Sequence, residues 1–255
     1  MSQPLSLHGG CLFLAFYEVI KLDYEKPQIV ISLTGENMKE ISALIFDCDG
    51  VMFDSKDANI SFYNHLLAHF DLGPLKYSDI EYIHMHTSEE CVRRIFKDSA
   101  YEEEAQELRR QASYSAFIRD MKMEPGLIEL LDSLKPRFGL AIATNRSDTI
   151  KEVVNIFDLE GYFDIIVSCL EVKKPKPHPE QVERILTFFG IEPEEALFIG
   201  DSELDAEASR AAGVPFVAYK NMSLTARHHI ASLLEVKEII DGRCLKHPSA
   251  RDNRD

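Results

Sequence analysis

The stretch 43–51, Ala-Leu-Ile-Phe-Asp-Cys-Asp-Gly-Val, limits the possible fold of this chain more than any other. Its apolar run has no polar break, which is typical of a strand buried inside a parallel sheet. The run ends in Asp47 and Asp49, whose side chains project to the same side of an extended strand, roughly 7 Å apart. Buried carboxylates are costly unless something uses them, and ligands bind at the carboxyl ends of strands in open α/β sheets. The alternative is that the two acids cap the segment that follows.

The rest of the chain alternates between strand patterns and helix patterns. Apolar runs at 138–143, 163–167, 196–199 and 214–218 predict further buried strands, and helical spacing separates them. This alternation predicts an α/β fold with a doubly wound parallel sheet and right-handed crossovers. Residues 56–122 show helical spacing and no convincing strand, so we expect an all-helical insert after the first core strand.

The patterns divide the chain into four segments. The α/β core is expected to comprise 38–55 and 123–241, with the helical insert at 56–122 between its two parts. Residues 1–37 are expected to be either a poorly ordered N-terminal extension or an artefact of the assigned start, and 28–33 could be another strand. The apolar part of this extension follows no Lys or Arg, so we expect no secretory signal there. The polar tail 242–255 is expected to fray.

Composition limits the possible partners. The 255 residues include 28 basic and 43 acidic side chains, a net charge of −15, which disfavours nucleic acids and anionic membrane surfaces. No apolar run reaches the roughly 18 residues that a membrane-spanning helix needs. The five cysteines are scattered without paired spacing, which is typical of reduced thiols in a cytoplasmic protein. A phosphate site on so acidic a chain must carry its own local cations.

Four predicted strand ends carry polar groups that a parallel sheet would bring together. They are Asp47 with Asp49, Thr144 with Asn145, the lysines around Lys174, and Asp201 with Asp205. The intervals from Thr144 to Lys174 and from Lys174 to Asp201, 30 and 27 residues, suit single strand–helix crossovers. The 97 residues from Asp47 to Thr144 match a crossover plus the helical insert.

These groups suit the transfer of a phosphoryl group. Several carboxylates around one point repel one another unless a cation joins them, and oxygen-rich sites select hard cations, of which Mg²⁺ is the expected one. A lysine and a threonine hydroxyl nearby suit a bound phosphoryl group. One carboxylate can attack as a nucleophile, and a second can protonate the leaving group and then activate water. Taken singly, Thr144 and Asn145 would be ordinary cap or turn residues, and Lys174 an ordinary surface charge.

Four stretches resemble the signatures of the haloacid dehalogenase (HAD) superfamily. They are 46–51 with 54–55, 143–145, 174–179, and 199–205 with 211–213. The likeness extends from about residue 41 to residue 240. The subgroup resembled includes phosphoglycolate phosphatase and beta-phosphoglucomutase. The resemblance implies a Rossmann-like core with a helical cap inserted after the first core strand.

The resemblance also implies roles for single residues. Asp47 would be the nucleophile and Asp49 the general acid and base. Thr144 and the Asn145 backbone would bind the phosphoryl group. The dehalogenase branch lacks an acid at the second position, so Asp49 speaks against dehalogenation.

The same resemblance implies a cation and a lysine at the site. The metal ligands would be Asp47, Asp201 and the Asp49 carbonyl oxygen, with Asp205 holding metal-bound water or the lysine. The lysine that neutralises the phosphate would be Lys174, which stands directly before the first proline of the Pro-x-Pro pattern. Lys173 and Lys176 are the alternatives.

A histidine pair marks the insert. His84 and His86 could contact the leaving group of the substrate, or bind a soft metal together with the methionine between them. The other interpretation is a polar loop whose Thr87 caps the next helix, because Glu90 stands at capping-box distance from it.

The sequence therefore predicts a Mg²⁺-dependent phosphatase, a phosphoric monoester hydrolase that uses an aspartyl-phosphate intermediate. Its substrate would be a small-molecule phosphate ester, either phosphoglycolate-like or a sugar phosphate. A phosphomutase of the beta-phosphoglucomutase type is the alternative among enzymes. A non-catalytic binding or regulatory protein on the same scaffold is the alternative from another class. The presence of both Asp47 and Asp49 argues against that last reading.

Overall fold

The computed structural model describes residues 40–112, 114–147 and 149–242. The candidate strand at 28–33 and the polar tail after Gly242 lie outside this range. Within it, no helix has the length and apolar character to cross a membrane.

Six strands form one parallel sheet. They are β1 (Ala43–Phe46), β4 (Gly139–Ala143), β5 (Ile165–Val167), β6 (Ala196–Gly200), β7 (Phe216–Tyr219) and β8 (His228–Ile230). Their order across the sheet is β5-β4-β1-β6-β7-β8, and every neighbouring pair is parallel. The chain thus builds outward from β1 in one direction and then in the other, so its topological switch point lies beside β1. This confirms the predicted doubly wound sheet, although β8 was not predicted.

β1 occupies the middle of the sheet, and both of its faces are covered. Leu44 and Phe46 belong to one apolar cluster, and Ile45 belongs to the other. All three side chains are fully buried. Burying a side chain of this size contributes about 1.5–3 kcal/mol. The double coverage explains why the run contains no polar residue before Asp47.

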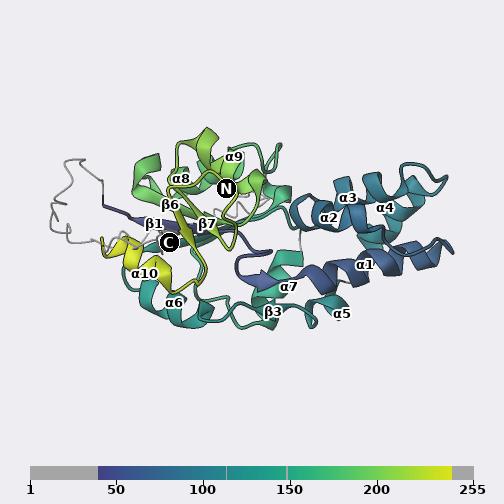
Figure 1. Ribbon diagram of the computed structural model, residues 1–255, viewed down its shortest axis with the longest axis horizontal. Helices are drawn as coiled ribbons and strands as arrows, with labels where there is room; N and C mark the ends of the chain where they lie inside the picture. Colours follow the sequence, from purple (N-terminus) through teal and green to yellow (C-terminus); the bar gives the residue numbers. More distant parts are fainter. Residues whose placement is uncertain (1–39, 113, 148, 243–255) are drawn as a thin grey trace, which may run out of the picture. The chain divides into compact units, whose positions relative to one another are not determined.

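Helices cover the two faces of the sheet. They are α6 (Leu127–Leu134), α7 (Thr149–Ile156), α8 (Glu180–Phe189), α9 (Glu203–Ala212) and α10 (Glu235–Ile240). Buried residues of α6, α7 and α10 join the cluster of Leu44, whereas those of α8 and α9 join the cluster of Ile45. Figure 1 shows α8 and α9 on one side of β1 and β6, with α6 and α10 on the other. The core therefore has three layers.

The segment between β1 and α6 is helical. It contains α1 (Lys56–His69), a 3-10 turn (Tyr77–Asp79), α2 (Ile80–Met85), α3 (Ser88–Phe96), α4 (Glu102–Gln111) and α5 (Ser115–Ile118). Two short antiparallel strands, β2 (Phe53–Asp54) and β3 (Lys122–Met123), pair at its two ends. The pairing gives the insert two adjacent connections to the core.

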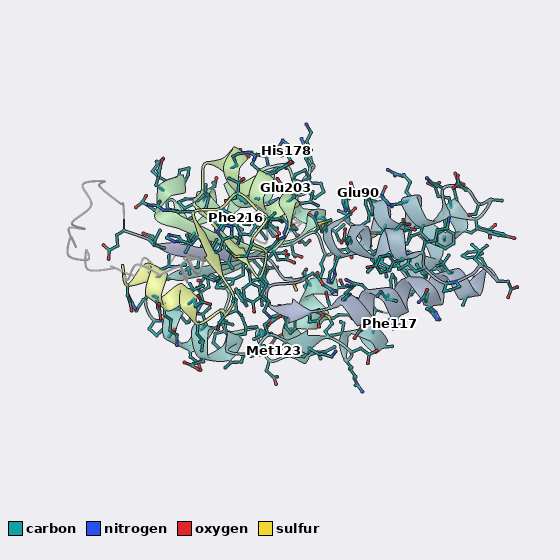
Figure 2. The ribbon with its side chains drawn as sticks, in the orientation of Figure 1. Glu90, Phe117, Met123, His178, Glu203 and Phe216 are labelled. Carbon is teal, nitrogen blue, oxygen red and sulfur yellow. The ribbon has the colours of Figure 1, made fainter. Side chains whose placement is uncertain are left out.

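An aromatic group packs the inside of the insert. Phe62 of α1 lies edge-on to Tyr114 and Phe117, with ring centroids 5.0 Å and 5.6 Å away. Phe117 and Glu90, a residue of α3, are labelled in Figure 2. Thr87 begins α3 with a full capping box, since its hydroxyl accepts the Glu90 backbone N–H and the Glu90 carboxylate accepts the Thr87 N–H. This confirms the predicted cap.

Candidate active site

The carboxyl ends of β1 and β6 bring three acids together. Asp47 follows β1, Asp201 follows β6, and Asp205 lies in the first turn of α9. One carboxylate oxygen from each of the three lies within 4.8 Å of the others. A group of three oxygen donors at this spacing suits a hard divalent cation.

The lysine that joins these carboxylates is Lys176, which corrects the choice of Lys174. The Lys176 ammonium donates to Asp47 Oδ1 and to Asp205 Oδ1, each at 2.6 Å, and to the Ala143 carbonyl at 2.8 Å. Lys174 is exposed, and its backbone N–H, like that of Lys173, donates to the Glu180 carboxylate. Glu180, the first residue of α8, therefore holds the backbone of Lys173 and Lys174 at the surface. The chain turns inward at Lys176.

Gln181 fixes this inward turn and was not predicted. Its side-chain oxygen accepts the Lys176 backbone N–H at 2.9 Å. Its side-chain nitrogen donates to the carbonyls of Thr144 and Val167, at 2.7 Å and 3.0 Å. The side chain is fully buried. It therefore ties the lysine loop to the ends of β4 and β5. Sequence reasoning missed it because a glutamine in the first turn of a helix is ordinarily exposed.

Asp49 is held by two donors from different segments. The Arg146 guanidinium donates to both Asp49 oxygens, each at 2.6 Å, and the Ser55 hydroxyl also donates to this carboxylate. Burial favours the neutral acid, but Arg146 and Ser55 outweigh it and keep the pKa of Asp49 below its ordinary value. Asp49 is therefore ionised in this arrangement. Ser55 is also the N-cap residue of α1, but its side chain makes no cap bond to that helix.

The site carries more negative than positive charge. Its carboxylates are Asp47, Asp49, Asp201 and Asp205, and the cations bonded to them are Lys176 and Arg146. Burial, with Asp205 and Asp49 nearby, raises the pKa of Asp47 to about 7 despite the adjacent Lys176. Burial and the neighbouring carboxylates also raise the pKa of Asp201. Two carboxylates lack a compensating charge, so the residues present fit one divalent cation.

Gly50, in the turn after β1, allows the backbone to pass close to the Asp201 side chain. Its φ of +83° lies in the left-handed region. A Cβ atom there would lie 2.0 Å from Asp201 Oδ2. Any other residue would therefore be strained in its backbone and would displace an acid of the site.

Thr144 and Asn145 follow β4 at the edge of the same site. Thr144 is 1% exposed, and its hydroxyl accepts the Arg146 backbone N–H at 3.1 Å. The Asn145 side-chain nitrogen donates to the Lys176 carbonyl and to the Met85 carbonyl of α2, both at 3.0 Å. The Asn145 side-chain oxygen is buried without a hydrogen-bond partner among the described residues. Asn145 thus connects the lysine loop with the helical insert.

These groups surround a cavity of about 510 Å³. Seven predicted site residues line it, namely Asp47, Asp49, His84, His86, Thr144, Asn145 and Asp201. Asp205 lies behind the lining, where one of its oxygens accepts from Lys176 and the other from Ser202. This places Asp205 as the partner of the lysine, one of its two expected positions.

The two histidines of the insert differ in their surroundings. His84 Nδ1 lies 3.3 Å from the Asn59 side-chain nitrogen, and burial lowers the pKa of His84. His86 stacks on Tyr82 with ring centroids 3.6 Å apart, and its Nδ1 lies 3.0 Å from the Tyr82 carbonyl. In the described part of the chain, the only group of His, Cys, Asp or Glu with metal-ligand spacing contains neither histidine. Asp49 and Asp54 act against this lowering of the His84 pKa, but burial outweighs them.

A family model, curated proteins and a solved structure that resemble this chain agree with one another. The model of a family described as haloacid dehalogenase-like hydrolase matches residues 44–219. Pyrophosphatase PpaX of Bacillus velezensis is 28% identical over 186 residues, which cover 69% of this chain and 81% of that protein. Phosphoglycolate phosphatase of Aquifex aeolicus is 31% identical over 176 residues, which cover 67% and 80%. The crystal structure of a HAD-superfamily hydrolase, subfamily IA, variant 1, from Geobacter sulfurreducens is 39% identical, with a TM-score of 0.70 over 78% of this chain and 99% of that one.

Proposed function

The chain belongs to the haloacid dehalogenase-like hydrolase family, and from this premise we propose that it is a Mg²⁺-dependent phosphatase for a small phosphorylated metabolite. The observation that carries the proposal is the contact of Lys176 with Asp47 beside Asp201 and Asp205. A carboxylate, a lysine and an oxygen-donor cation site within one cavity suit the attack on a phosphoryl group. The names of the two curated relatives, a pyrophosphatase and a phosphoglycolate phosphatase, support phosphate-containing substrates.

Asp47 is the nucleophile of the proposed reaction. Lys176 holds its Oδ1, which leaves Oδ2 to attack the phosphorus atom of the bound ester. The bond from Asp47 to phosphorus forms while the bond to the leaving oxygen breaks, giving an aspartyl phosphate. Water then attacks this intermediate, releases inorganic phosphate and restores the carboxylate.

The phosphoryl group is bound by residues from two elements. Thr144 offers its hydroxyl at the end of β4, and Lys176 offers its ammonium from the loop after β5. A Mg²⁺ held by Asp47, Asp201 and the Asp49 carbonyl oxygen would neutralise charge on the phosphoryl group and on the attacking carboxylate. Asp205 fixes Lys176 in this arrangement.

Asp49 acts as the general acid and base. Its ionised state beside Arg146 suits the second half of the reaction, in which it accepts a proton from the attacking water. In the first half it gives the leaving oxygen the proton that it accepted from water in the preceding turnover. That step requires the contact with Arg146 to open, because the guanidinium favours the carboxylate form.

Phosphate release tests the proposal. Wild-type protein is assayed with sugar phosphates, phosphoglycolate and pyrophosphate, with and without Mg²⁺, beside Asp47→Asn and the control Asp54→Asn. Asp54 is an exposed acid outside the cavity. We expect Mg²⁺-dependent release that falls by about 10³-fold or more in Asp47→Asn and stays within twofold in Asp54→Asn. Equal release by wild type and Asp47→Asn, or no release from any substrate, would contradict the proposal.

A further inference from the structure

The helical insert presents no carboxylate to the active-site cavity. Residues 56–118 contain eleven Asp and Glu residues against seven Lys and Arg residues, so the insert is acidic overall. All eleven acids are described, and none of them lines the cavity. Arg109 and Arg110 do line it, as do His84 and His86. The charge of the insert is therefore segregated, with its acids facing elsewhere.

Arg109 differs from the other arginines of the insert in its partners. Its Nε donates to the Gln106 side-chain oxygen and one terminal nitrogen donates to the Ser88 hydroxyl, both at 2.9 Å. Both partners are neutral. The remaining arginines are ion-paired, in the pairs Arg93 with Glu89, Arg94 with Asp79, and Arg110 with Glu107. Within the described residues, Arg109 is the arginine of the insert that has no carboxylate partner.

The state of Arg109 suits the binding of an anion. A guanidinium has five N–H donors, and the two bonds of Arg109 leave three of them free. Those two bonds hold the half-buried side chain in one orientation before any ligand arrives. A partly desolvated cation without a counter-ion is costly, and an anionic ligand removes that cost.

The phosphoryl group already has its own cation in Lys176, which belongs to the core. Arg146, the other core cation lining the cavity, is occupied by Asp49. Arg109 belongs to α4 of the insert, and its hydrogen bonds go to Gln106 and Ser88 and not to Asp47 or Asp49. It is therefore available to a different part of the substrate, the part that leaves.

We propose that Arg109 binds a second anionic group, a carboxylate or a phosphate, carried by the leaving part of the substrate. The enzyme then selects phosphate compounds whose leaving group is itself an anion. This inference rests on the phosphatase function proposed above and narrows its substrate class. The planar guanidinium can bind either anion through two parallel hydrogen bonds.

Matched substrates test the proposal. Phosphoglycolate and 2-hydroxyethyl phosphate differ in a carboxylate against a neutral alcohol, and pyrophosphate distinguishes a phosphate from a carboxylate as the second anion. We expect Arg109→Gln to raise KM about 10- to 100-fold for whichever anionic substrates wild type prefers, with kcat within twofold. The KM and kcat of the neutral ester should stay within twofold. Arg109→Lys should fall between wild type and Arg109→Gln.

Arg93→Gln is the matched control. Arg93 belongs to α3 of the same insert and does not line the cavity, and its side chain is 61% exposed and paired with Glu89. We expect less than a twofold change for every substrate. A measurement without variants complements it, since glycolate should inhibit wild type competitively while ethylene glycol should not.

The outcomes separate this inference from the proposed function. If wild type releases phosphate but prefers the neutral ester, or Arg109→Gln weakens charged and neutral substrates alike, the role of Arg109 is wrong and the phosphatase function stands. If wild type releases no phosphate from any of the three compounds, both proposals fall. Should Arg109→Gln not fold, wild-type selectivity, product inhibition and Arg109→Lys still decide the matter.

Discussion

At the scale of single residues, Lys176 sets the charge balance beside β1. Burial alone would lower the pKa of its ammonium, but Asp205 and Asp47 raise that pKa above its ordinary value. The side chain therefore stays protonated throughout the physiological pH range. Its ammonium holds Asp205 in place and bonds only one of the two Asp47 oxygens.

We expect Lys176→Met to lower phosphate release by about 10²–10³-fold, because it removes a buried cation that would face the phosphoryl group in the proposed reaction. Lys174→Met is the matched control in the same loop. It should change release by less than twofold, since Lys174 is exposed and contributes only its backbone N–H. Initial rates at saturating Mg²⁺ measure both. A larger loss in Lys174→Met than in Lys176→Met would refute this assignment.

The sequence predicts the acids of the site better than its cations. Asp47, Asp49 and Asp201 could be predicted because each directly follows a buried apolar run. No comparable signal distinguishes the lysines at 173–176, which share one polar loop. The residue that turns inward is decided by hydrogen bonds from α8, and such tertiary contacts leave no periodic pattern. For the same reason, the sequence does not reveal that Arg109 has no carboxylate partner among the described residues.

At the scale of elements, the first turn of α8 positions the lysine loop. Glu180 accepts the backbone N–H groups of Lys173 and Lys174, and Gln181 accepts that of Lys176. The turn therefore fixes the backbone of three residues in the loop. It also holds this loop to the ends of β4 and β5 through Gln181.

Gln181→Leu should lower the free energy of unfolding by about 2–4 kcal/mol. The change leaves the Lys176 N–H and the Thr144 carbonyl without the partner that Gln181 supplies, whereas the Val167 carbonyl still accepts the Thr144 N–H. Each unsatisfied buried group costs about 1–3 kcal/mol, partly offset by the apolar side chain. Phosphate release should fall as well, because the loop is no longer held. Urea denaturation measures the stability.

Thr187→Leu is the control on the same helix, because Thr187 is exposed. Its free energy of unfolding should stay within about 0.5 kcal/mol of wild type. An equal loss of stability in both variants would show that Gln181 acts only through the helix and not through the loop.

Elements with long periodic patterns were predicted, and elements decided by packing were not. The spacing of Ala105, Leu108 and Ala112 predicts one helix over 101–117, but the helix breaks at Ala112, whose ψ is 126°. Nothing in the local sequence marks the break. Beyond it, the Tyr114 hydroxyl donates to Asn59 of α1 at 2.5 Å, so a contact between helices outweighs helical propensity. The three-residue strand β8 is too short to give a periodic signal.

At the scale of the whole molecule, the architecture follows from a few long apolar runs. The parallel sheet and the helical segment after its first strand were both predictable, because strand–helix alternation and its interruption extend over many residues. The cavity lining was predictable only in part. Which side chains of an insert face a cavity depends on how its helices pack, and the spacing of apolar residues does not encode that.

Whole-molecule stability reflects the charge of the site. The pKa of Asp47 is about 7 in the folded protein, against 3.8 for an ordinary aspartate. The folded state thus binds the proton of the Asp47 carboxyl more tightly than the unfolded state does. The stabilisation that this proton gives is fully present below about pH 4 and is lost as the pH rises through 7. The raised pKa of Asp201 acts in the same direction. Without divalent cations, we expect Asp47→Asn to unfold about 5 °C above wild type at pH 7.5.

Thermal unfolding in the presence of a chelator, from pH 5 to pH 8, measures this difference. It should become smaller as the pH falls from 8 to 5, because Asp47 of the folded protein binds its proton over this range, and it should reach zero only below about pH 4. Burial lowers the pKa values of His84 and His228, which gives an opposite pH dependence near pH 6, but both proteins contain these histidines and their effect cancels. Mg²⁺ at pH 7.5 should then stabilise wild type more than Asp47→Asn. A cation that binds the folded but not the unfolded protein shifts the equilibrium toward the folded state, and the variant lacks one of the proposed metal ligands. A difference that stays constant with pH would show that the charge of Asp47 does not destabilise the metal-free fold. The expected result would mean that the negative charge that Asp47 carries in the proposed reaction opposes folding until a cation offsets it.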